Sequence, residues 1–442
     1  MKKLILCLLL SGPAVGQDPG DSGRDRAAME WFRDAKLGIF IHWGYSAVNG
    51  TEISWPLWHG QTSHADYLAQ AEGFTAARYD PAAWARLFKE TGARYAVLTS
   101  KHHDGVAMWE TKQSRLNVVE KTPAARDLVG PYCSAMRDAG LKVGLYFSLC
   151  DWSHPDYEVP FSRANSPSGE YVTEDYPQKE EEELPSWERF LSYCRAQMRE
   201  LHELYRPDLW WLDGDWEHSA EEWKAADLRD SLRSWNPGVL INSRLRGYGD
   251  YRTPEQDPPL SPPEPPWELC MTMNDTWAYR PSDTSYKSSR EIVRIFVECL
   301  GGGGNLLLNV GPKPDGTIPE EQVDRLEDLG RWIRKHEEAV YSTVAGLPAG
   351  YFYGPSAVAD DSLTVYLYLF DIPREFVALK GLRTPVKRIR VVGKEESLNW
   401  FVRDSMPWND IPGIVYMAVP ERLLDETVTV LAVELEEPVR WK

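Results

Sequence analysis

The chain has 442 residues and a formal net charge of −18, and 43% of its residues are hydrophobic. This length exceeds the usual size of one small domain, so we expect a large domain followed by an accessory one. The acidic residues are spread along the chain without a basic stripe, which argues against nucleic acid as a partner. The 19 Trp residues suit sugar binding, because a ring can cover the C–H face of a pyranose.

The N-terminus has the pattern of an export signal. Lys2-Lys3 is followed by an apolar run over residues 4–10 and by Ala14-Val15-Gly16, a small-x-small cleavage site. The run is too short to cross a bilayer, and no other segment of the sequence is long enough. We therefore predict a cleaved signal peptide over residues 1–16 and a secreted or periplasmic protein without a membrane span. The alternative reading is an ordinary hydrophobic first strand.

The cysteines and glycines indicate no cofactor. Loss of Cys7 with the signal leaves an odd number of irregularly spaced cysteines, which indicates neither a disulfide framework nor a zinc site. The sequence has no Gly-x-Ser-x-Gly elbow and no dinucleotide fingerprint, and the glycine run 301–304 precedes a predicted strand instead of following one. We expect neither a metal nor a cofactor.

Unbroken apolar runs predict buried strands over most of the chain. They occupy residues 37–44, 95–100, 143–148, 209–212, 239–244, 270–273 and 305–310. Between them, capping signals and helical spacing of apolar residues predict helices. These helices fall near residues 29–35, 80–92, 127–140, 187–201, 220–234 and 318–338. The alternation is typical of a parallel α/β fold, and it supplies seven strands of a (β/α)8-like barrel over residues 17–344. The eighth strand has no clear signal.

Two segments interrupt this alternation of strands and helices, and an all-β pattern follows it. Residues 154–185 are polar and acidic, which predicts a long surface insertion. Residues 254–266 contain seven prolines and can form neither a helix nor a central strand. Short β-branched segments separated by turn residues then predict an all-β sandwich over residues 345–442.

Asp213 is the central candidate for chemistry. It follows the apolar run 209–212 and precedes Gly214, so it would lie at the carboxyl end of a strand, where barrel enzymes place catalytic groups. Other strands end in the same way, at His42, His102, His103, Tyr146 and Arg244, and Glu255 lies in the loop just beyond. Two carboxylates among such groups, without metal-ligand spacing, suit glycoside hydrolysis. The alternative for Asp213 is a structural acid in a turn.

The chain resembles the α-L-fucosidases of glycoside hydrolase family 29 over about residues 31–343. The C-terminal β module also stands in the expected place. The resemblance is carried by motifs that are weak alone but specific in this order and spacing. They are Gly-Ile-Phe-Ile-His-Trp-Gly at 38–44, Lys-His-His-Asp-Gly at 101–105, Leu-Tyr-Phe-Ser at 145–148, Trp-Leu-Asp-Gly at 211–214, Asn-Ser-Arg at 242–244, Trp-Glu at 267–268, and the segments 305–312 and 338–341.

The resemblance implies the catalytic roles. Asp213 would be the nucleophile of a retaining double displacement, kept ionised by Arg244 or a nearby histidine. The stretch 250–255 is similar to a family loop that ends in the acid/base, which makes Glu255 the general acid and then the general base. Glu268 in the Trp-Glu motif is the rival for this role. The two carboxyl groups of a retaining pair are expected about 5–5.5 Å apart.

The resemblance also implies sugar contacts. Neutral imidazoles can each donate and accept a hydrogen bond, which suits the hydroxyls of fucose. The family pattern assigns substrate binding to His42, His102, His103, Tyr146, Arg244 and Trp277, with Glu52, Trp55 and Glu268 as further candidates. Adjacent residues point to opposite faces of a strand, which argues against a metal held by the His-His pair.

The chain departs from the family pattern at residues 52–55. Glu is usually followed directly by Trp, whereas here Glu52 precedes Ile53, and Trp55 comes two residues later. We expect the Glu52 contact to be kept and the Trp55 contact to be displaced or lost. The closing motif also reads His336-Glu337-Glu338 in place of Asn-Gly-Glu.

These features predict an exported retaining exo-glycosidase that releases α-L-fucose from fucosylated oligosaccharides or glycoconjugates. The alternatives are a retaining hydrolase of a related sugar such as a galactoside, and a catalytically silent barrel that binds carbohydrate.

Overall fold

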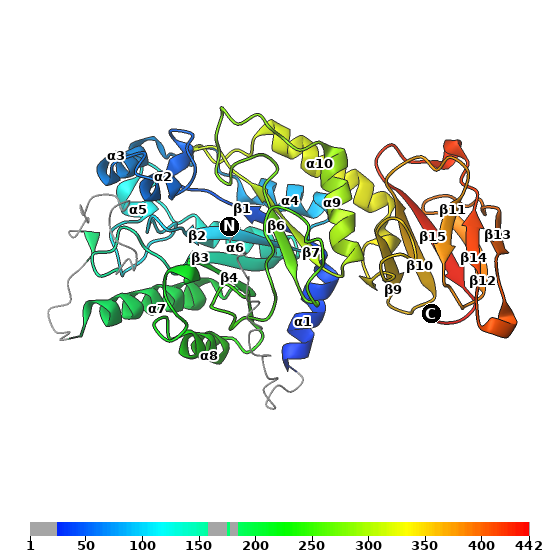
Figure 1. The fold of residues 1–442 in the computed structure, drawn as a ribbon. Coiled ribbons are helices and arrows are strands. Elements are labelled where there is room, and N and C mark those ends of the chain that lie inside the picture. Colours follow the sequence, from blue (N-terminus) through cyan, green and yellow to red (C-terminus); the bar gives the residue numbers. More distant parts are fainter. Residues whose placement is uncertain (1–23, 158–174, 177–183, 442) are drawn as a thin grey trace, which may run out of the picture.

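The computed structural model describes residues 24–157, 175–176 and 184–441. The predicted signal peptide over residues 1–16 lies outside the described residues, as does most of the insertion predicted over residues 154–185. A parallel sheet with surrounding helices forms the larger domain, and an all-β domain follows it at the far end of the molecule (Figure 1).

The central sheet has seven parallel strands in the order β5-β4-β3-β2-β1-β7-β6. All seven predicted strands are confirmed, and the sixth begins two residues earlier than predicted. Their interiors are buried on both faces, which explains why each one is an apolar run in the sequence. The strands are β1 (Leu37–Ile41), β2 (Tyr95–Lys101), β3 (Lys142–Ser148), β4 (Leu209–Asp213), β5 (Leu240–Ile241), β6 (Glu268–Met271) and β7 (Asn305–Val310).

An irregular segment takes the place of an eighth strand between the edges β5 and β6. Isolated parallel bridges join Asn242 to Tyr251, Arg252 to Trp267, and Glu255 to Cys270. The segment therefore pairs with residues of both edges without forming a regular ladder. It brings Glu255 next to β6, near the carboxyl ends of the strands.

Helices connect the strands and cover the sheet. The predicted start and stop of α4 (Pro81–Thr91) are confirmed, because Asp80 Oδ1 accepts from Ala83 N at 2.9 Å and Gly92 ends the helix with φ 94°. The other long helices are α1 (Arg24–Ala35), α6 (Val129–Asp138), α7 (Ser186–Tyr205), α8 (Ala225–Trp235), α9 (Ser289–Gly301) and α10 (Glu320–Lys335). Three short ones are α2 (Trp55–Trp58), α3 (His64–Ala69) and α5 (Val118–Lys121). The helix α9 was not predicted from the sequence.

The C-terminal domain contains two antiparallel sheets, in the orders β12-β15-β10-β9-β8 and β11-β14-β13. Side chains from both sheets share one apolar core, as predicted for a sandwich. The strands are β8 (Thr343–Ala345), β9 (Ser356–Ala359), β10 (Thr364–Leu369), β11 (Val377–Lys380), β12 (Val386–Val391), β13 (Trp400–Arg403), β14 (Ile414–Met417) and β15 (Thr429–Leu435). The domain boundary predicted between residues 344 and 345 falls within β8.

The larger sheet of the C-terminal domain lies against α9 and α10 (Figure 1). Trp332 Nε1 of α10 donates to Val428 O at 2.9 Å. All five cysteines in the described part of the chain are buried and unpaired. None of the helices in the described ranges is long and apolar enough to cross a bilayer.

Candidate active site

A cavity of about 300 Å³ lies at the carboxyl ends of the strands. It gathers every predicted site residue except Glu52 and Glu268, as expected for parallel strands that end at one mouth. Its lining comprises Phe40, His42, Trp55, His102, His103, Tyr146, Trp211, Asp213, Trp216, Arg244, Glu255 and Trp277. Among the described residues, no cluster of three or more His, Cys, Asp or Glu side chains could hold a metal ion.

Asp213 is the last residue of β4, and three polar groups surround its carboxylate. Tyr146 Oη donates to Oδ2 at 3.0 Å, and Arg244 Nη1 donates to Oδ1 at 3.0 Å. His103 Nε2 lies 3.9 Å from Oδ2. Burial alone would raise the pKa of Asp213, but Arg244, His103 and the hydrogen bonds outweigh it and lower the pKa below its ordinary value. Asp213 is therefore ionised at neutral pH.

Gly214 turns the chain immediately after the nucleophile candidate. Its φ of 80° lies in the left-handed region, and a Cβ there would come 2.6 Å from Sγ of Cys150. Only glycine fits this turn without moving its neighbours. The turn ends β4 with Asp213 facing the cavity.

Arg244 joins the two candidate catalytic carboxyl groups. Its Nη2 donates to Glu255 Oε2 at 2.6 Å, while its Nη1 holds Asp213. Its Nε donates to Thr253 Oγ1 at 3.1 Å, and its Cζ lies 4.6 Å from the centroid of the Trp211 ring. The side chain of Glu255 is 40% exposed, against 10% for Asp213. One acid is thus enclosed, and the other stands at the open side of the cavity.

The hydrogen-bond partners of His42 and His103 fix the tautomers of both rings. Asn309 Nδ2 donates to Trp277 O at 2.7 Å, so Asn309 Oδ1 accepts from Nδ1–H of His42 at 2.7 Å. Ser148 Oγ donates to Cys150 O at 2.6 Å, so it accepts from Nδ1–H of His103 at 2.6 Å.

These tautomers leave Nε2 of both rings as a hydrogen-bond acceptor. Burial lowers the pKa of His42 to about 4 and that of His103 to about 4, against a partial opposing effect of Asp213. Both imidazoles are neutral at physiological pH. Each can therefore accept a hydrogen bond from a hydroxyl group in the cavity.

His102 is oriented by a residue of the unusual 52–55 segment. Its Nδ1 lies 2.7 Å from Ser54 Oγ, which also accepts from Asp104 N at 3.0 Å. Burial and the neighbouring His103 lower the pKa of His102 well below its ordinary value. The His102 ring is parallel to that of Tyr146, with centroids 5.2 Å apart and an interplanar angle of 6°.

Trp55 lines the cavity, so of the two expected outcomes, displacement or loss, the structure excludes the loss of this residue from the site. The first turn of α2 places Trp55 parallel to Trp216, with centroids 6.4 Å apart and an angle of 11°. Trp216 is 40% exposed and was not predicted as a site residue. Its position three residues after Asp213 is the signal that could have identified it.

Glu52 does not line the cavity, which corrects its predicted direct contact with the sugar. Its Oε1 accepts from the backbone N–H of Ile53 at 2.9 Å and of Ala278 at 3.0 Å. Its Oε2 accepts from Trp277 N at 2.8 Å. Glu52 therefore holds the backbone of Trp277, whose ring packs 4.8 Å from that of His42.

Glu268 is also absent from the cavity, contrary to its prediction as a sugar contact or rival acid/base. As the first residue of β6 it is fully buried inside the barrel, where Oε1 accepts from Trp211 Nε1 at 2.9 Å and Oε2 accepts from Tyr95 Oη. Burial raises the pKa of Glu268 to about 7. Of the two candidates for acid/base, only Glu255 lies in the cavity.

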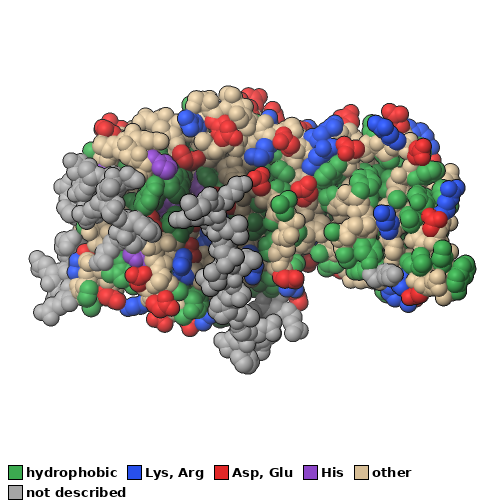
Figure 2. Space-filling model, viewed as in Figure 1, with side chains coloured by type: hydrophobic (Ala, Val, Ile, Leu, Met, Phe, Trp, Pro, Cys, Tyr) green, Lys and Arg blue, Asp and Glu red, His purple; other side chains and the backbone are tan. Residues whose placement is uncertain are grey.

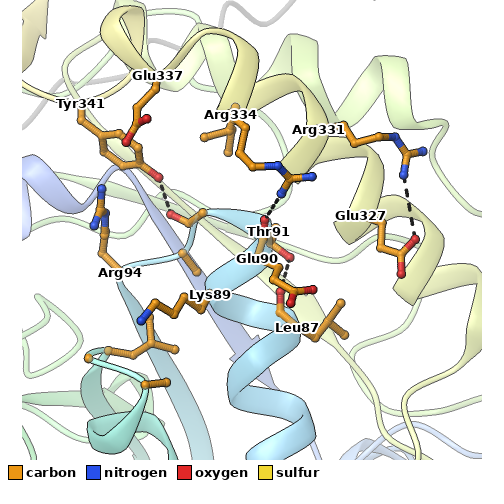
Figure 3. Close-up of a pocket in the computed structure, with 16 residues that line it drawn as sticks. Leu87, Lys89, Glu90, Thr91, Arg94, Glu327, Arg331, Arg334, Glu337 and Tyr341 are labelled. Carbon is orange, nitrogen blue, oxygen red and sulfur yellow. Dashed lines mark hydrogen bonds and ion pairs between the residues drawn. The ribbon is translucent and has the colours of Figure 1, made fainter.

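A larger cavity of about 620 Å³ opens near the C-terminal ends of α4 and α10 (Figure 3). Several of its polar groups already have partners, since Tyr341 Oη donates to Gly92 O at 2.5 Å and Arg331 pairs with Glu327 at 3.9 Å (Figure 3). This larger cavity lies at the amino ends of the strands, because Arg94, one of its lining residues, directly precedes β2. In barrel enzymes this end serves stability, so the smaller cavity is the candidate active site.

The chain is similar to known proteins over most of its length. A family model described as "Alpha-L-fucosidase" matches residues 15–338. The chain is 33% identical to the α-L-fucosidase of Branchiostoma floridae, over 73% of this chain and 74% of that protein. It is 31% identical to the tissue α-L-fucosidase of Rattus norvegicus, over 77% of each chain.

Solved structures are similar over nearly the whole chain. α-L-Fucosidase isoenzyme 1 from Paenibacillus thiaminolyticus has a TM-score of 0.83 and 32% identity, and the match covers 94% of this chain and 100% of that one. A family 29 α-L-fucosidase from Bacteroides thetaiotaomicron, solved as a covalent intermediate trapped with 2-fluoro-fucosyl fluoride, has a TM-score of 0.78 and 26% identity. That match covers 97% of this chain and 98% of the other.

Proposed function

The chain belongs to the α-L-fucosidase family of retaining glycoside hydrolases, and we propose that it releases α-L-fucose from fucosylated oligosaccharides or glycoconjugates by double displacement. In this proposal Asp213 is the nucleophile and Glu255 the acid/base. The observation that carries it is the Arg244 guanidinium, which contacts both carboxyl groups at the edge of one cavity. A retaining mechanism needs two such groups on opposite sides of a single sugar.

In the first step, an oxygen of Asp213 attacks the anomeric carbon, and the bond from that carbon to the leaving oxygen breaks. Glu255 gives its proton to the leaving oxygen, so the aglycone departs as a neutral alcohol. Ionised Asp213 suits the attack, and Tyr146 and Arg244 hold its oxygens in place. The greater exposure of Glu255 suits an acid that donates to the leaving group.

In the second step, the Glu255 carboxylate takes a proton from water as the water oxygen attacks the anomeric carbon. The bond to Asp213 breaks, which frees the nucleophile and yields fucose with retained configuration. Arg244 Nη2, which donates to Glu255 Oε2 at 2.6 Å, holds this carboxyl group in place.

Recognition of the sugar is assigned to the three histidines and the aromatic wall. Neutral His42 and His103 each present an Nε2 acceptor, and His102 adds a third imidazole. Phe40 and Trp277 supply apolar ring surface on the same cavity, which suits the methyl group of fucose. The cavity volume of about 300 Å³ is at the small end for ligand sites, and so favours one sugar residue.

The surface supports a neutral glycan as the partner. On the face shown in Figure 2, Lys and Arg side chains are interspersed with Asp and Glu side chains over both domains. The net charge of −18 would oppose the approach of a polyanion.

We also propose that the protein is exported, with residues 1–16 removed as a signal peptide. The support is the sequence pattern of Lys2-Lys3, the apolar run 4–10 and Ala14-Val15-Gly16. N-terminal sequencing of protein from the periplasm or medium is expected to begin at Gln17. Recovery of the intact N-terminus in the cytoplasm would contradict export.

Substrate profiling on aryl glycosides tests the choice of sugar. We expect cleavage of an aryl α-L-fucoside and much slower cleavage of aryl galactosides. Cleavage of a galactoside without cleavage of the fucoside would show that the substrate sugar is galactose and not fucose. Hydrolysis of no glycoside at all would support the silent barrel.

Asp213→Gly with added azide tests the nucleophile. We expect this variant to lose hydrolysis and to regain turnover with azide, which fits the space left by the carboxylate and gives a fucosyl azide. The matched variant Asp215→Gly removes a neighbouring acid that does not line the cavity, and its loss of activity should be small. Unchanged hydrolysis by Asp213→Gly without azide would exclude Asp213 as the nucleophile.

A further inference from the structure

Glu268 is a buried acid that the double displacement does not use. It lies inside the barrel, fully buried, and its two oxygens accept from Trp211 Nε1 and Tyr95 Oη. The two donors come from different strands, because Trp211 is in the middle of β4 and Tyr95 begins β2. An indole has only one polar hydrogen, so Glu268 holds the single group that can fix Trp211 by hydrogen bonding.

The Trp211 ring contacts both groups that donate to Asp213. The Tyr146 ring lies 5.6 Å away at an angle of 19°, and the Arg244 Cζ lies 4.6 Å from the Trp211 centroid. Tyr146 holds Oδ2 of Asp213 and Arg244 holds Oδ1. Tyr146 and Arg244, the two donors to Asp213, therefore both pack against the Trp211 ring, and the orientation of this ring affects their positions.

Several other titratable or charged groups interact with Glu268. Tyr95, Tyr251, Cys270 and Arg244 all lie close enough for their charges to affect it or be affected by it. Burial raises the pKa of Glu268 to about 7, while Tyr95, Trp211 and Arg244 act in the opposite direction. An ionised carboxylate accepts from Trp211 and Tyr95 at once, and charge-assisted hydrogen bonds are the stronger ones.

We propose that Glu268 is a positioning residue of the active site, which fixes the plane of Trp211 and thereby holds Tyr146 and Arg244 against Asp213. This inference rests on the proposed function, since it assigns Asp213 the role of nucleophile. Glu268 itself does not line the cavity. Its effect reaches the chemistry through one indole ring.

Two single variants and their combination test the coupling. Trp211→Phe keeps an aromatic ring and removes the N–H, whereas Glu268→Gln keeps an acceptor and removes the charge. On an aryl α-L-fucoside, each is expected to lower kcat about tenfold, the size expected for a hydrogen bond to a charged group, with KM nearly unchanged. The double variant should lose no more than the worse single one, because both act through the same contact.

A matched control makes the same Glu→Gln change away from the site. Glu200 accepts from Trp109 Nε1 at 3.4 Å and from Thr111 Oγ1 at 2.7 Å, outside the cavity. Glu200→Gln is expected to keep wild-type kcat. Wild-type kcat in folded Glu268→Gln and Trp211→Phe, or losses that multiply in the double variant, would overturn the inference.

The indole N–H resonance of Trp211 gives a readout that does not need activity. It is identified by its loss in Trp211→Phe, and in the wild type it should shift with pH around a midpoint near 7 as Glu268 titrates. In Glu268→Gln the shift should vanish, and a persisting shift would contradict the coupling. If the wild type cleaves no fucoside, the proposed function fails, while this resonance still decides whether Glu268 controls Trp211.

Discussion

Arg244 Nη2 lies 2.6 Å from Oε2 of Glu255, on the same guanidinium whose Nη1 holds Asp213. The guanidinium, together with His103, lowers the pKa of Asp213 below its ordinary value against the opposing effect of burial. That suits Asp213 as a nucleophile. The second contact of the guanidinium holds Glu255, the proposed acid/base, beside it.

Arg244→Met is expected to lower kcat/KM about 100-fold or more, since removing one partner of a buried ion pair is costly. Burial of Asp213 persists while its strongest counter-charge is lost, so its pKa rises. The acid limb of kcat/KM, measured between pH 3 and 8, should therefore move to higher pH. Arg244→Lys keeps the positive charge but loses the planar guanidinium that contacts both carboxyl groups. The acid limb of its kcat/KM profile should therefore move less than that of Arg244→Met. An unmoved limb in Arg244→Met would contradict this role.

Asn309→Asp should weaken substrate binding in a pH-dependent way. The new carboxylate would face Nδ1–H of His42, where it favours the imidazolium and raises the pKa of His42 above about 4. A protonated ring has no acceptor at Nε2, so KM should rise about tenfold, the cost of one hydrogen bond made to substrate. KM should fall again towards alkaline pH as the proton leaves. A KM that does not vary with pH in this variant would contradict the role of His42 Nε2 as an acceptor for the substrate.

Glu52→Ala should impair binding through Trp277, although Glu52 does not line the cavity. The substitution removes the acceptor of three backbone N–H groups, those of Ile53, Trp277 and Ala278. We expect affinity for a fucose-like iminosugar to fall about tenfold, with Glu52→Gln in between because its amide keeps one acceptor. Calorimetric titration of both variants measures this. Wild-type affinity in Glu52→Ala would show that Trp277 needs no such support.

His336 links the two domains and provides a test of stability. Its Nε2 lies 2.8 Å from Asp425 Oδ2, and its Nδ1 lies 2.8 Å from Trp332 O. His336→Ala should lower the free energy of unfolding by about 1.5–3 kcal/mol, as for hydrogen bonds to charged groups, with kcat unchanged. A change in kcat without a change in stability would contradict a purely structural link.

The stability that the His336–Asp425 contact contributes depends on pH, and the direction of this dependence follows from the pKa of Asp425. Burial raises the pKa of Asp425, but His336 and Lys335 outweigh it, so the folded pKa is below the ordinary 3.8. The stabilisation by ionised Asp425 is therefore complete above pH 3.8, its ordinary pKa, and is lost as the pH falls through its lower pKa in the folded protein. The difference in Tm between wild type and Asp425→Asn should shrink below that pH. A constant difference would exclude this account.

The sequence predicted the regular part of the barrel because its strands are buried on both faces. The apolar runs of β1 to β4 and β7 leave little choice of structure. The segment that closes the sheet was not predicted, because it contains Pro254 and pairs only through isolated bridges. The helix α9 was also missed, although Ser288 and Glu291 form a capping box at its start.

The positions of the candidate site residues followed from the sequence where these residues end strands, but not where they begin them. Asp213 and Arg244 follow apolar runs, so their meeting at one mouth is expected from the topology. Glu268 begins β6, so it lies inside the barrel below the cavity, whereas its motif suggested a position at the cavity. Glu52 contacts a loop over 200 positions away along the chain, and no local pattern gives such a contact. The stacking of Trp55 on Trp216 likewise depends on tertiary structure.

The most direct test of the account is to locate the covalent intermediate. Glu255→Gln, slowed in the second step, is incubated with 2-fluoro-fucosyl fluoride, whose activated leaving group needs little acid assistance. The labelled protein is then digested and analysed by mass spectrometry. We expect one 2-fluoro-fucosyl adduct per chain, on Asp213. An adduct on any other residue, or none in a variant whose wild type cleaves aryl α-L-fucosides, would contradict it.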